Sequence, residues 1–357
     1  MKVLIFTECL AGGVCSVISD QIQYLSAEDK QLQFDLLYSK KDETPKDLAQ
    51  RFPDVGLIEI PYERGERFFL VKVFCYLLFR VKTKNYSVIH LHSSFSGFLG
   101  RIAFGLSAHK LCYTPHCFAF LSEEFSPLKQ KVFYWIEKRL SLIGCIVACG
   151  GSEAKLAKGF STKVRVHTIS NGVNFSDLTS SVTSSQADII SVGRICKQKG
   201  FDDFKALYAL ASHQYSLVWL GGPKPDGIDY VSGWLSREAL FQYYSSARLY
   251  VSTAHWEGMP VAPIEAQYFG LPVVAIRTHG VVDCVVDGET GYLCDSIEEL
   301  YQRCQQLLSD TSEYQRLSHN AKAHIRKHFS LANYAGLLSL YRQIAADTLA
   351  LSEQTLS

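Results

Sequence analysis

Two glutamates of this 357-residue chain stand in a pattern that could do chemistry. Glu257 lies in the sequence Trp-Glu-Gly-Met-Pro, where glycine and proline exclude a helix interior. Glu265 follows eight positions later in an apolar segment that predicts a helix, with Pro260 suited to its first position and Gly270 to its end. The N-terminus of a helix favours phosphate, and carboxylates accept hydrogen bonds from hydroxyl groups. The segment therefore predicts a site for a sugar nucleotide.

A basic loop precedes this segment in the second half of the chain. Its sequence, Gly-Arg-Ile-Cys-Lys-Gln-Lys-Gly, spans residues 193–200 and follows an expected strand. Arg194 and Lys199 would lie at the carboxyl end of that strand, where open α/β sheets bind ligands. Fixed cations there can neutralise a departing diphosphate. A solvated basic loop is the alternative, and the two glutamates disfavour it.

Three other interpretations of the glutamate pair are weaker. Two exposed glutamates on one helix would need a continuous helix through Gly258 and Pro260. A glycosidase carboxylate pair would need two carboxyl groups at a fixed short distance across a sugar, and the phosphate-favouring surroundings argue against it. A sugar-nucleotide epimerase would need acid and base carboxylates that the sequence does not single out.

The first half contributes glycines and a histidine. Gly12 and Gly13 follow the first expected strand and open a helix, so backbone could approach an anion there, although any turn of this kind can be glycine-rich. His116 follows a later strand and would also lie at a carboxyl end, facing the cleft; a surface or packing histidine is the alternative. His90 and His92 share one strand face and are expected to be structural or peripheral.

Expected strands and helices alternate along the chain, which predicts two Rossmann-like, doubly wound parallel-sheet α/β domains with a ligand cleft between them. In the first half, strands are expected over 3–7, 34–38, 56–60, 88–92, 110–114 and 146–148, and helices over 14–25, 67–81, 99–106 and 131–143. Residues 176–185 are rich in serine and threonine and are expected to form a linker. In the second half, strands are expected over 189–192, 216–220, 249–252 and 273–276, and helices over 201–212, 238–246, 261–269, 297–308 and 331–349.

Composition restricts the class of protein. No apolar run is long enough to span a membrane, and the short first strand lacks the features of a signal peptide. The eleven cysteines form no Cys-x-x-Cys pair and none has zinc-site spacing with histidine, so reduced thiols in a cytoplasmic enzyme are expected. No nucleic-acid partner is expected.

Positive charge is concentrated in the first half. Residues 1–175 hold 22 Lys/Arg and 16 Asp/Glu, whereas the remainder holds 14 and 19. Between residues 62 and 84, cations alternate with aromatic and aliphatic residues, a pattern typical of a helix lying on an anionic bilayer. A core helix with basic ends is the alternative. The cations are Arg64, Arg67, Lys72, Arg80, Lys82 and Lys84.

The order and spacing of these motifs resemble the retaining family-4 glycosyltransferases with the GT-B fold over nearly the whole chain. The motifs are Gly12-Gly13, His116, Ile-Ser-Asn-Gly-Val at 169–173, the 193–200 loop, and Glu257 with Glu265. The stretch His-Leu-His-Ser-Ser from residue 90, continued by Gly-Phe-Leu-Gly-Arg at 97–101 and Tyr-Thr-Pro-His at 113–116, resembles the bacterial branch that extends polyprenyl-diphosphate-linked saccharides for O-antigen, capsule or exopolysaccharide.

The resemblance implies how the nucleotide part of a donor would be bound. Arg194 and Lys199 would hold the diphosphate, and Glu265 would hold the ribose hydroxyls. The backbone near Trp234 and Leu235 would meet the base. A UDP-sugar is implied by what is common in the family, whereas the sequence names neither the sugar nor the acceptor.

The same resemblance implies the contacts of the donor sugar. Glu257 would position it together with the backbone N–H groups of Gly258, Met259 and Val261. His116 would contact it from the N-terminal domain near the reacting carbon, so His116, Arg194, Lys199 and Glu257 are the expected catalytic residues.

The resemblance further implies the domain roles. Residues 1–175, with the final helix returning over about 331–357, would form the acceptor-binding domain, whose first loop reaches the phosphate through Gly12 and Gly13. Residues 186–330 would bind the nucleotide sugar. The acceptor would be a lipid-linked saccharide, and the enzyme would lie peripherally at the inner face of the cytoplasmic membrane.

Chemistry without a metal or cofactor is expected, because no Asp-x-Asp pair is present and Arg194 and Lys199 can stabilise the leaving group. The family implies retention of the anomeric configuration. Two departures from its pattern are Cys117, where glycine is common, and Gly-Gly-Ser-Glu at 150–153, where Ser-x-Ser-Glu is common. A phosphorylase and a catalytically inactive sugar-nucleotide-binding subunit are the remaining alternatives.

Overall fold

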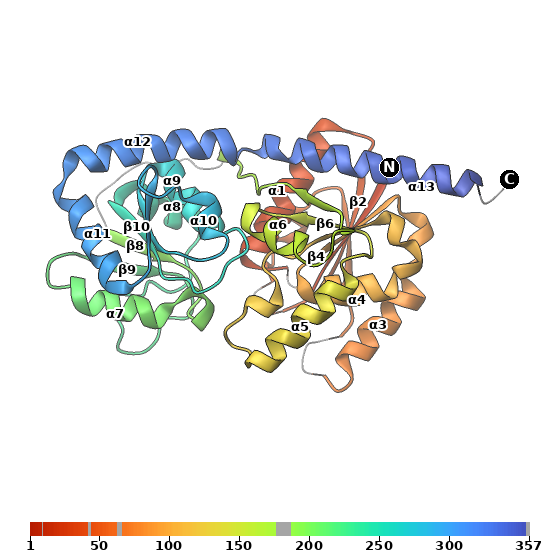
Figure 1. Ribbon diagram of the computed structural model, residues 1–357, viewed down its shortest axis with the longest axis horizontal. Helices are drawn as coiled ribbons and strands as arrows, with labels where there is room; N and C mark the ends of the chain where they lie inside the picture. The colour runs from red at the N-terminus through yellow and green to blue at the C-terminus, as the bar shows by residue number, and fades with distance from the viewer. Residues whose placement is uncertain (9, 42–43, 63–65, 176–186, 355–357) are drawn as a thin grey trace. The chain divides into compact units, whose positions relative to one another are not determined.

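The computed structural model describes residues 1–8, 10–41, 44–62, 66–175 and 187–354 (Figure 1). The chain divides into two compact units. Unit 1 comprises Met1–Leu121, Phe125–Gly172 and Leu331–Ser357, and unit 2 comprises Ser122–Glu124 and Val173–Ser330. The expected linker at 176–185 lies outside the described residues.

Unit 1 is built on a seven-stranded parallel sheet in the order β3-β2-β1-β4-β5-β6-β7. The order reverses between β1 and β4, so crossovers leave the sheet in both directions and loops diverge at the carboxyl ends of these two strands. The strands are β1 (Lys2–Thr7), β2 (Gln33–Ser39), β3 (Val55–Ile60), β4 (Val88–His92), β5 (Leu111–Thr114), β6 (Cys145–Ala148) and β7 (Val166–Thr168).

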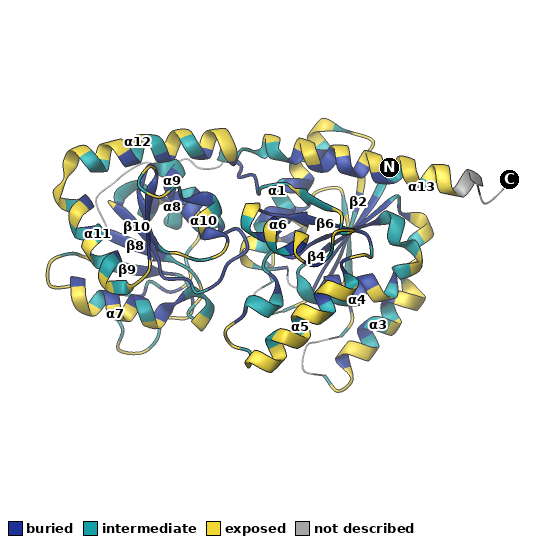
Figure 2. Cartoon of the chain, in the orientation of Figure 1, coloured by how far each residue is buried: buried dark blue, intermediate teal, exposed yellow. Residues whose placement is uncertain are grey.

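Both faces of this sheet are buried, which is why its strands are apolar at consecutive positions. Val3 and Ile5 of β1 pack into one core with α1 and α13, whereas Leu4 and Phe6 pack into the other with α3 and α4. Figure 2 shows the strands buried between these helices. The helices are α1 (Gly12–Glu28), α2 (Leu48–Arg51), α3 (Phe69–Arg80), α4 (Ser94–Ala103), α5 (Pro127–Leu140), α6 (Gly151–Lys158) and α13 (Ala335–Gln354), with short 3₁₀ turns η1 (Thr83–Asn85), η2 (Gly105–Lys110), η3 (Ala119–Leu121) and η6 (Leu331–Tyr334).

Unit 2 contains a five-stranded parallel sheet in the order β12-β11-β10-β8-β9. Because β8 and β10 are hydrogen-bonded neighbours, the loops that leave their carboxyl ends emerge side by side. The strands are β8 (Ile189–Val192), β9 (Leu217–Leu220), β10 (Leu249–Ser252), β11 (Val273–Ile276) and β12 (Gly291–Cys294). The helices are α7 (Phe201–Ala211), α8 (Arg237–Ser246), α9 (Val261–Phe269), α10 (Val281–Cys284), α11 (Ile297–Ser309) and α12 (Thr311–His328), with the 3₁₀ turn η5 (Lys197–Lys199).

The predicted α/β class with two parallel-sheet units is confirmed, and most predicted strands lie within a residue or two of those observed. The predicted start of α4 was wrong, because the helix begins at Ser94 and not at Leu99. The predicted start of α5 was also late, since Ser126 caps a helix that begins at Pro127. Strands β7 and β12 and helices α2, α6, α10 and α12 were not predicted.

Helix α9 ends as its sequence indicates, with Gly270 in the left-handed conformation at φ +91°. Its bounds, Val261–Phe269, are those predicted, but Pro260 is not its first residue. Pro260 has extended backbone, with φ −72° and ψ 125°, and precedes the helix. Pro263 instead lies inside the first turn, where a missing N–H group costs no intrahelical hydrogen bond.

Candidate active site

The two loops that follow β8 and β10 are bonded to each other along their length. The His255 N–H donates to the Gln198 carbonyl at 2.9 Å, and Gln198 Nε2 donates to the Trp256 carbonyl at 3.2 Å. The Thr253 hydroxyl donates to the Gly200 carbonyl at 2.8 Å. These bonds hold the 193–200 loop against the segment that carries Glu257.

Gly200 is required for this close approach. Its φ is +68°, and a Cβ atom there would lie 1.8 Å from the Thr253 carbonyl oxygen. On the other side of the glutamate segment, a Cβ on Gly280 would lie 2.2 Å from the Gly258 carbonyl oxygen. Backbone therefore packs directly on both sides of residues 253–258 and fixes the position of Glu257.

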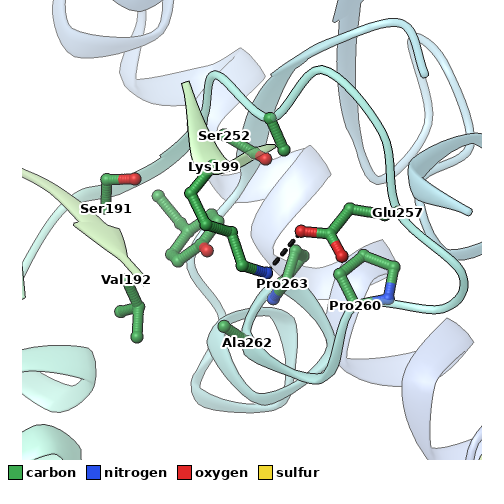
Figure 3. A pocket seen from close by; sticks show the side chains of 10 residues that line it. Ser191, Val192, Lys199, Ser252, Glu257, Pro260, Ala262 and Pro263 are labelled. Carbon is green, nitrogen blue, oxygen red and sulfur yellow. Dashed lines mark hydrogen bonds and ion pairs between the residues drawn. The ribbon is translucent and has the colours of Figure 1, made fainter. Parts of the chain in front are cut away.

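Lys199 and Glu257 form an ion pair at the centre of this arrangement (Figure 3). The Glu257 side chain is only 9% exposed and the Lys199 side chain 25% exposed, so the pair lies largely out of water. The pair lines a small pocket. Its other lining residues are Ser191, Val192, Tyr250, Ser252, Ala254, Pro260, Ala262 and Pro263.

The head of α9 faces this pocket and provides an anion-binding environment. Val261 and Ala262 occupy the first turn, where N–H groups have no intrahelical acceptor, and Ala262 lines the pocket. Met259 is buried just before this turn. A cation opposite a helix N-terminus is an arrangement suited to a phosphate group, which both would attract.

Glu265 lies further along α9 and is partly buried. Tyr244 of α8 donates its hydroxyl to Glu265 Oε2 at 3.3 Å. Burial raises the pKa of Glu265 to about 7, although the charge of Arg237 and the Tyr244 hydrogen bond act in the opposite direction. At neutral pH this carboxyl group is therefore divided between its neutral and ionised forms.

Arg194 and Trp234 lie on the exposed side of the same sheet edge. Arg194 Nη2 contacts Gln198 Oε1 at 3.5 Å, and its side chain is exposed. Trp234, 63% exposed, precedes the half-buried Leu235 in a segment tied to β9, since the Gly221 N–H donates to the Gly233 carbonyl at 3.0 Å. Loops from β8, β9 and β10 thus bring the predicted residues of unit 2 to one edge of its sheet.

In unit 1, Gly12 and Gly13 form the exposed N-terminus of α1, and Gly12 has φ +51°. A Cβ atom on Gly12 would meet no atom within 4 Å, so the requirement for glycine is conformational. The structure therefore places both glycines after β1, and His116 after β5, at carboxyl ends of the unit 1 sheet.

His116 belongs to a chain of histidines that the sequence did not reveal as connected. His116 Nε2 lies 2.8 Å from His92 Nδ1, and His116 Nδ1 lies 3.5 Å from Cys149 Sγ. His90 binds the Tyr341 hydroxyl at 2.6 Å and the Thr114 hydroxyl at 2.8 Å. His90 and His92 are fully buried.

Burial keeps these imidazoles neutral. It lowers the pKa of His116 to about 4 and the pKa of His90 to about 3, and it places the pKa of His92 well below its ordinary value. Burial also raises the pKa of the Cys149 thiol, which therefore keeps its proton and can donate to His116 Nδ1.

Glu153 holds the loop that carries His116. One carboxylate oxygen accepts the Cys117 N–H at 3.0 Å, and the other accepts the Cys149 N–H at 2.8 Å. His116 has φ +55° and Cys117 has φ +116°, a region that glycine favours. Glu153, the last residue of the Gly-Gly-Ser-Glu stretch, thus supports this loop.

Among the described residues, no group of three or more His, Cys, Asp or Glu side chains has the arrangement of a metal site. None of the helices within the described ranges is long and apolar enough to cross a membrane.

Two family models match adjoining parts of the chain. Glycosyltransferase Family 4 matches residues 11–177, and glycosyl transferases group 1 matches residues 180–324. With the two parallel-sheet units, these matches show that the chain belongs to the family-4 glycosyltransferases of GT-B fold.

Individual proteins show the same relationship. The chain is 29% identical over 250 residues to an uncharacterised 41.2 kDa protein in the cps region of Klebsiella pneumoniae, covering 63% of this chain and 69% of that protein. It is 26% identical over 256 residues to the UDP-Gal:α-D-GlcNAc-diphosphoundecaprenol α-1,3-galactosyltransferase of Escherichia coli, covering 60% and 64%. Sucrose-phosphate synthase from Thermosynechococcus elongatus has a TM-score of 0.81 at 21% identity, with 97% of this chain and 100% of that chain covered.

Proposed function

We propose that this enzyme transfers a hexose or N-acetylhexosamine from a UDP-sugar to a polyprenyl-diphosphate-linked saccharide, with retention of the anomeric configuration. The observation that carries the donor half is the Lys199–Glu257 pair beside the N-terminus of α9. The Escherichia coli relative, whose name specifies UDP-Gal and a diphosphoundecaprenol-linked GlcNAc, supports the acceptor class. The cps-region relative supports a role in surface-polysaccharide synthesis.

The ion pair supports a mechanism in which Lys199 leaves Glu257 and binds the diphosphate when the donor enters the site. The diphosphate attracts Lys199 and the N–H groups at the head of α9, and Arg194 is exposed and can close over it. Once Lys199 binds the diphosphate, the Glu257 carboxylate can accept hydrogen bonds from sugar hydroxyls. The backbone N–H groups of Gly258, Met259 and Val261 lie close to it in sequence and help to position the sugar. The same residues thus stabilise the free enzyme and recognise the donor.

The other proposed donor contacts come from residues that lie beyond the carboxyl ends of the strands. Glu265 accepts hydrogen bonds from the ribose hydroxyls, which favour its ionised form. The backbone at Trp234 and Leu235 meets the uracil. His116, neutral at physiological pH, contacts the sugar without adding a positive charge, and Gly12 and Gly13 let the α1 loop reach the phosphate.

The reaction needs one bond to break and one to form at the anomeric carbon. The bond from that carbon to the diphosphate oxygen breaks, and an acceptor hydroxyl attacks from the same face. Its proton passes to the departing diphosphate. Lys199 and Arg194 stabilise the charge that develops on the leaving group, so the proposed reaction is metal-independent.

The outward face of α3 supports peripheral attachment to the inner face of the cytoplasmic membrane. Phe69, Val73 and Leu77 are buried on one side of this helix. The opposite side is also apolar at helical spacing, with Phe68, Val71, Leu78 and Phe79 exposed. The exposed basic residues Arg67, Arg80, Lys82 and Lys84 flank it, and Arg64 lies outside the described residues. An apolar stripe flanked by cations suits an anionic bilayer.

A thermal-shift panel of UDP, GDP, ADP and CMP, each with and without EDTA, tests the donor site on wild-type enzyme and Lys199→Ala. A nucleotide at about 100 times its Kd should add roughly 2.7 kcal/mol to the free energy of unfolding. We expect UDP alone to stabilise the wild type, to survive EDTA and to fail on the variant. No stabilisation by any nucleotide would refute the proposed site.

Product analysis completes the test. Incubation with UDP-sugars and a lipid-linked GlcNAc acceptor should release UDP and form an α-linked product whose anomeric coupling is read by NMR. Binding of UDP with no product would instead assign the chain to the inactive sugar-nucleotide-binding subunits.

A further inference from the structure

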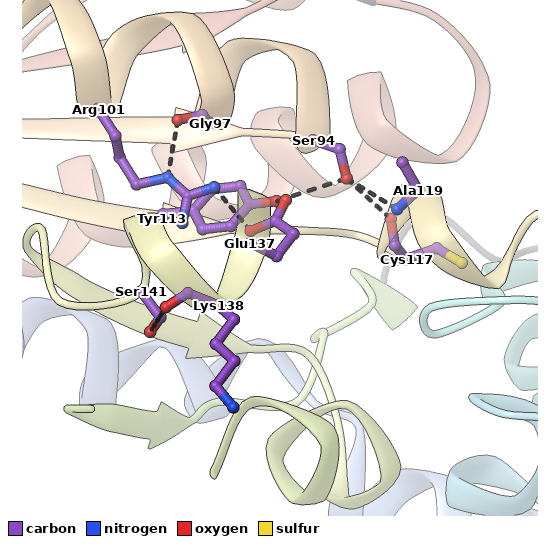
Figure 4. A network of polar contacts seen from close by, with 9 residues as sticks. All are labelled: Ser94, Gly97, Arg101, Tyr113, Cys117, Ala119, Glu137, Lys138 and Ser141. Atoms are coloured by element: carbon purple, nitrogen blue, oxygen red, sulfur yellow. Dashed lines mark hydrogen bonds and ion pairs between the residues drawn. The ribbon is translucent and has the colours of Figure 1, made fainter. Parts of the chain in front are cut away.

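Helix α5 has an unusual distribution of side chains. The only one of its residues that is fully buried is a carboxylate, Glu137. Its oxygens accept hydrogen bonds from Arg101 Nη2 at 2.7 Å and from the Tyr113 hydroxyl at 3.0 Å (Figure 4). The helix is thus held to α4 and β5 through a charged, hydrogen-bonded contact. Phe133 and Tyr134 also pack on neighbouring aromatic rings, whereas Leu128, Val132 and Trp135 are exposed.

The outward face of α5 is apolar at helical spacing. Leu128, Val132 and Trp135 recur at intervals of four and three residues and are 73%, 47% and 56% exposed, and Leu142 continues the stripe beyond the helix end at 55%. Soluble helices normally show the opposite pattern. In Figure 2, much of α5 has the yellow colour of exposed residues. This face therefore exposes apolar surface to water.

Cations flank the stripe and no exposed acid accompanies them on the helix. Lys129, Lys131, Lys138 and Arg139 are exposed, and the single acid of α5 is the buried Glu137. The Arg139 guanidinium lies over the Trp135 ring, 5.2 Å from its centroid. Aromatic and basic residues together are typical of the membrane interface.

We propose that α5 is a second membrane-contacting helix, which places Leu128, Val132 and Trp135 in the headgroup–acyl boundary of an anionic bilayer. Four cations on one short helix match lipid phosphates, whereas pairing with a second copy of α5 would bring like charges together. This inference rests on the membrane location in the proposed function but uses residues outside the 62–84 segment.

The neighbouring helices support a broad contact. Helix α4 packs against both α3 and α5, and it exposes Ile102, while the following turn η2 exposes Leu106. Inside the unit, the network below α5 continues from Tyr113 to the Ser94 hydroxyl, which accepts the Ala119 N–H at 3.1 Å. The membrane-contacting helix and the loop that carries His116 are therefore parts of one hydrogen-bonded assembly.

Vesicle flotation tests the proposal with three variants. The α5 variant is Val132→Ser with Trp135→Ser, the α3 variant is Val71→Ser with Leu78→Ser, and the control is Leu210→Ser, an exposed apolar residue on α7. UDP-induced thermal stabilisation reports whether each variant keeps its fold. We expect the α5 variant to lower the vesicle partition coefficient at least tenfold, because serine removes apolar surface that the bilayer would bury. The control should change it little.

Depth measurement adds a readout specific to α5. In a Trp234→Phe background, Trp135 is the remaining exposed tryptophan, because Trp219 and Trp256 are buried. Brominated lipids in vesicles with anionic headgroups should quench its fluorescence, and neutral vesicles should do so much less. Loss of flotation by the α3 variant alone, without quenching of Trp135, would overturn the α5 proposal and leave the proposed attachment intact.

Two further outcomes would also be decisive against α5. If wild-type protein fails to float on anionic vesicles, the whole membrane proposal is wrong, while transfer to a short-chain acceptor would still stand. If the protein is a dimer by light scattering and only the α5 variant makes it monomeric, with flotation unchanged, the face is an interface between copies.

Discussion

Replacing Glu265 with glutamine should change how the stability of the enzyme depends on pH. Burial raises the pKa of this carboxyl group from 4.5 to about 7. The folded state therefore binds the proton more tightly than the unfolded chain does. The resulting stabilisation is fully present below about pH 4.5 and is lost as pH rises through 7. Glutamine, neutral at every pH, removes this dependence.

The magnitude follows from the raised pKa. At 1.36 kcal/mol per pH unit, ionising Glu265 in the folded protein costs about 3 kcal/mol as an upper bound. Water reaches part of this half-buried side chain, which reduces the cost to roughly 1–2 kcal/mol. Urea unfolding at pH 5 and pH 8 should therefore show that wild type loses about this much stability relative to Glu265→Gln.

Ligand binding should show the opposite pH dependence. If ribose hydroxyls donate to the Glu265 carboxylate, binding selects the ionised form, and the Kd should fall about tenfold between pH 6 and pH 8. Uridine is the better probe, because a terminal phosphate itself titrates near pH 6. Calorimetry on both proteins gives the comparison. An equal pH dependence in Glu265→Gln would refute the ribose assignment and the role of burial.

Three other substitutions test the site and its support. Lys199→Ala should lower kcat by about 100-fold or more, because the leaving group needs a cation, and Lys199→Arg should keep more activity. A steady-state rate of Lys199→Ala above a tenth of the wild-type rate would contradict this. Gly200→Ala should unfold unit 2 or lower its Tm by many degrees, since the added Cβ would lie 1.8 Å from the Thr253 carbonyl oxygen. Gly227→Ala is the control, because Gly227 also has positive φ but a Cβ there would meet no atom within 4 Å, so a smaller loss is expected. Arg101→Met should cost about 3–5 kcal/mol in urea unfolding, because Glu137 would stay buried without its cation. The double variant with Glu137→Leu should recover part of that loss, and additive losses would show that the pair is not the cause.

Much of the fold was predictable because its signals are local. Alternating short apolar strands and helices indicate a parallel α/β sheet, and the switch in strand order places loops where ligands bind. Glycine and proline around Glu257 indicate a loop, and Gly270 indicates a helix end. Helix starts were less certain, since α5 begins with a serine cap followed by proline several residues before its periodic apolar pattern is recognisable.

The supporting contacts were not predictable, because their partners are far apart in sequence. Glu153 holds the Cys117 N–H across 36 positions, and Glu137 meets Arg101 across the same separation. His90 lies 251 positions from Tyr341. Single-sequence patterns carry no information on such pairs, and a glutamate in a helix is ordinarily expected to face water.

The sequence by itself determined the residue types and their order: the glutamate pair, the basic loop, the glycines, the histidine and the apolar periodicity that makes two parallel sheets. The tertiary structure alone decided which of these groups meet, how buried they are and therefore what charge they carry. Lys199 pairs with Glu257 because β8 and β10 are adjacent strands. Glu265 titrates near neutrality, and His116 stays neutral, because desolvation depends on neighbours in space and not on neighbours in sequence.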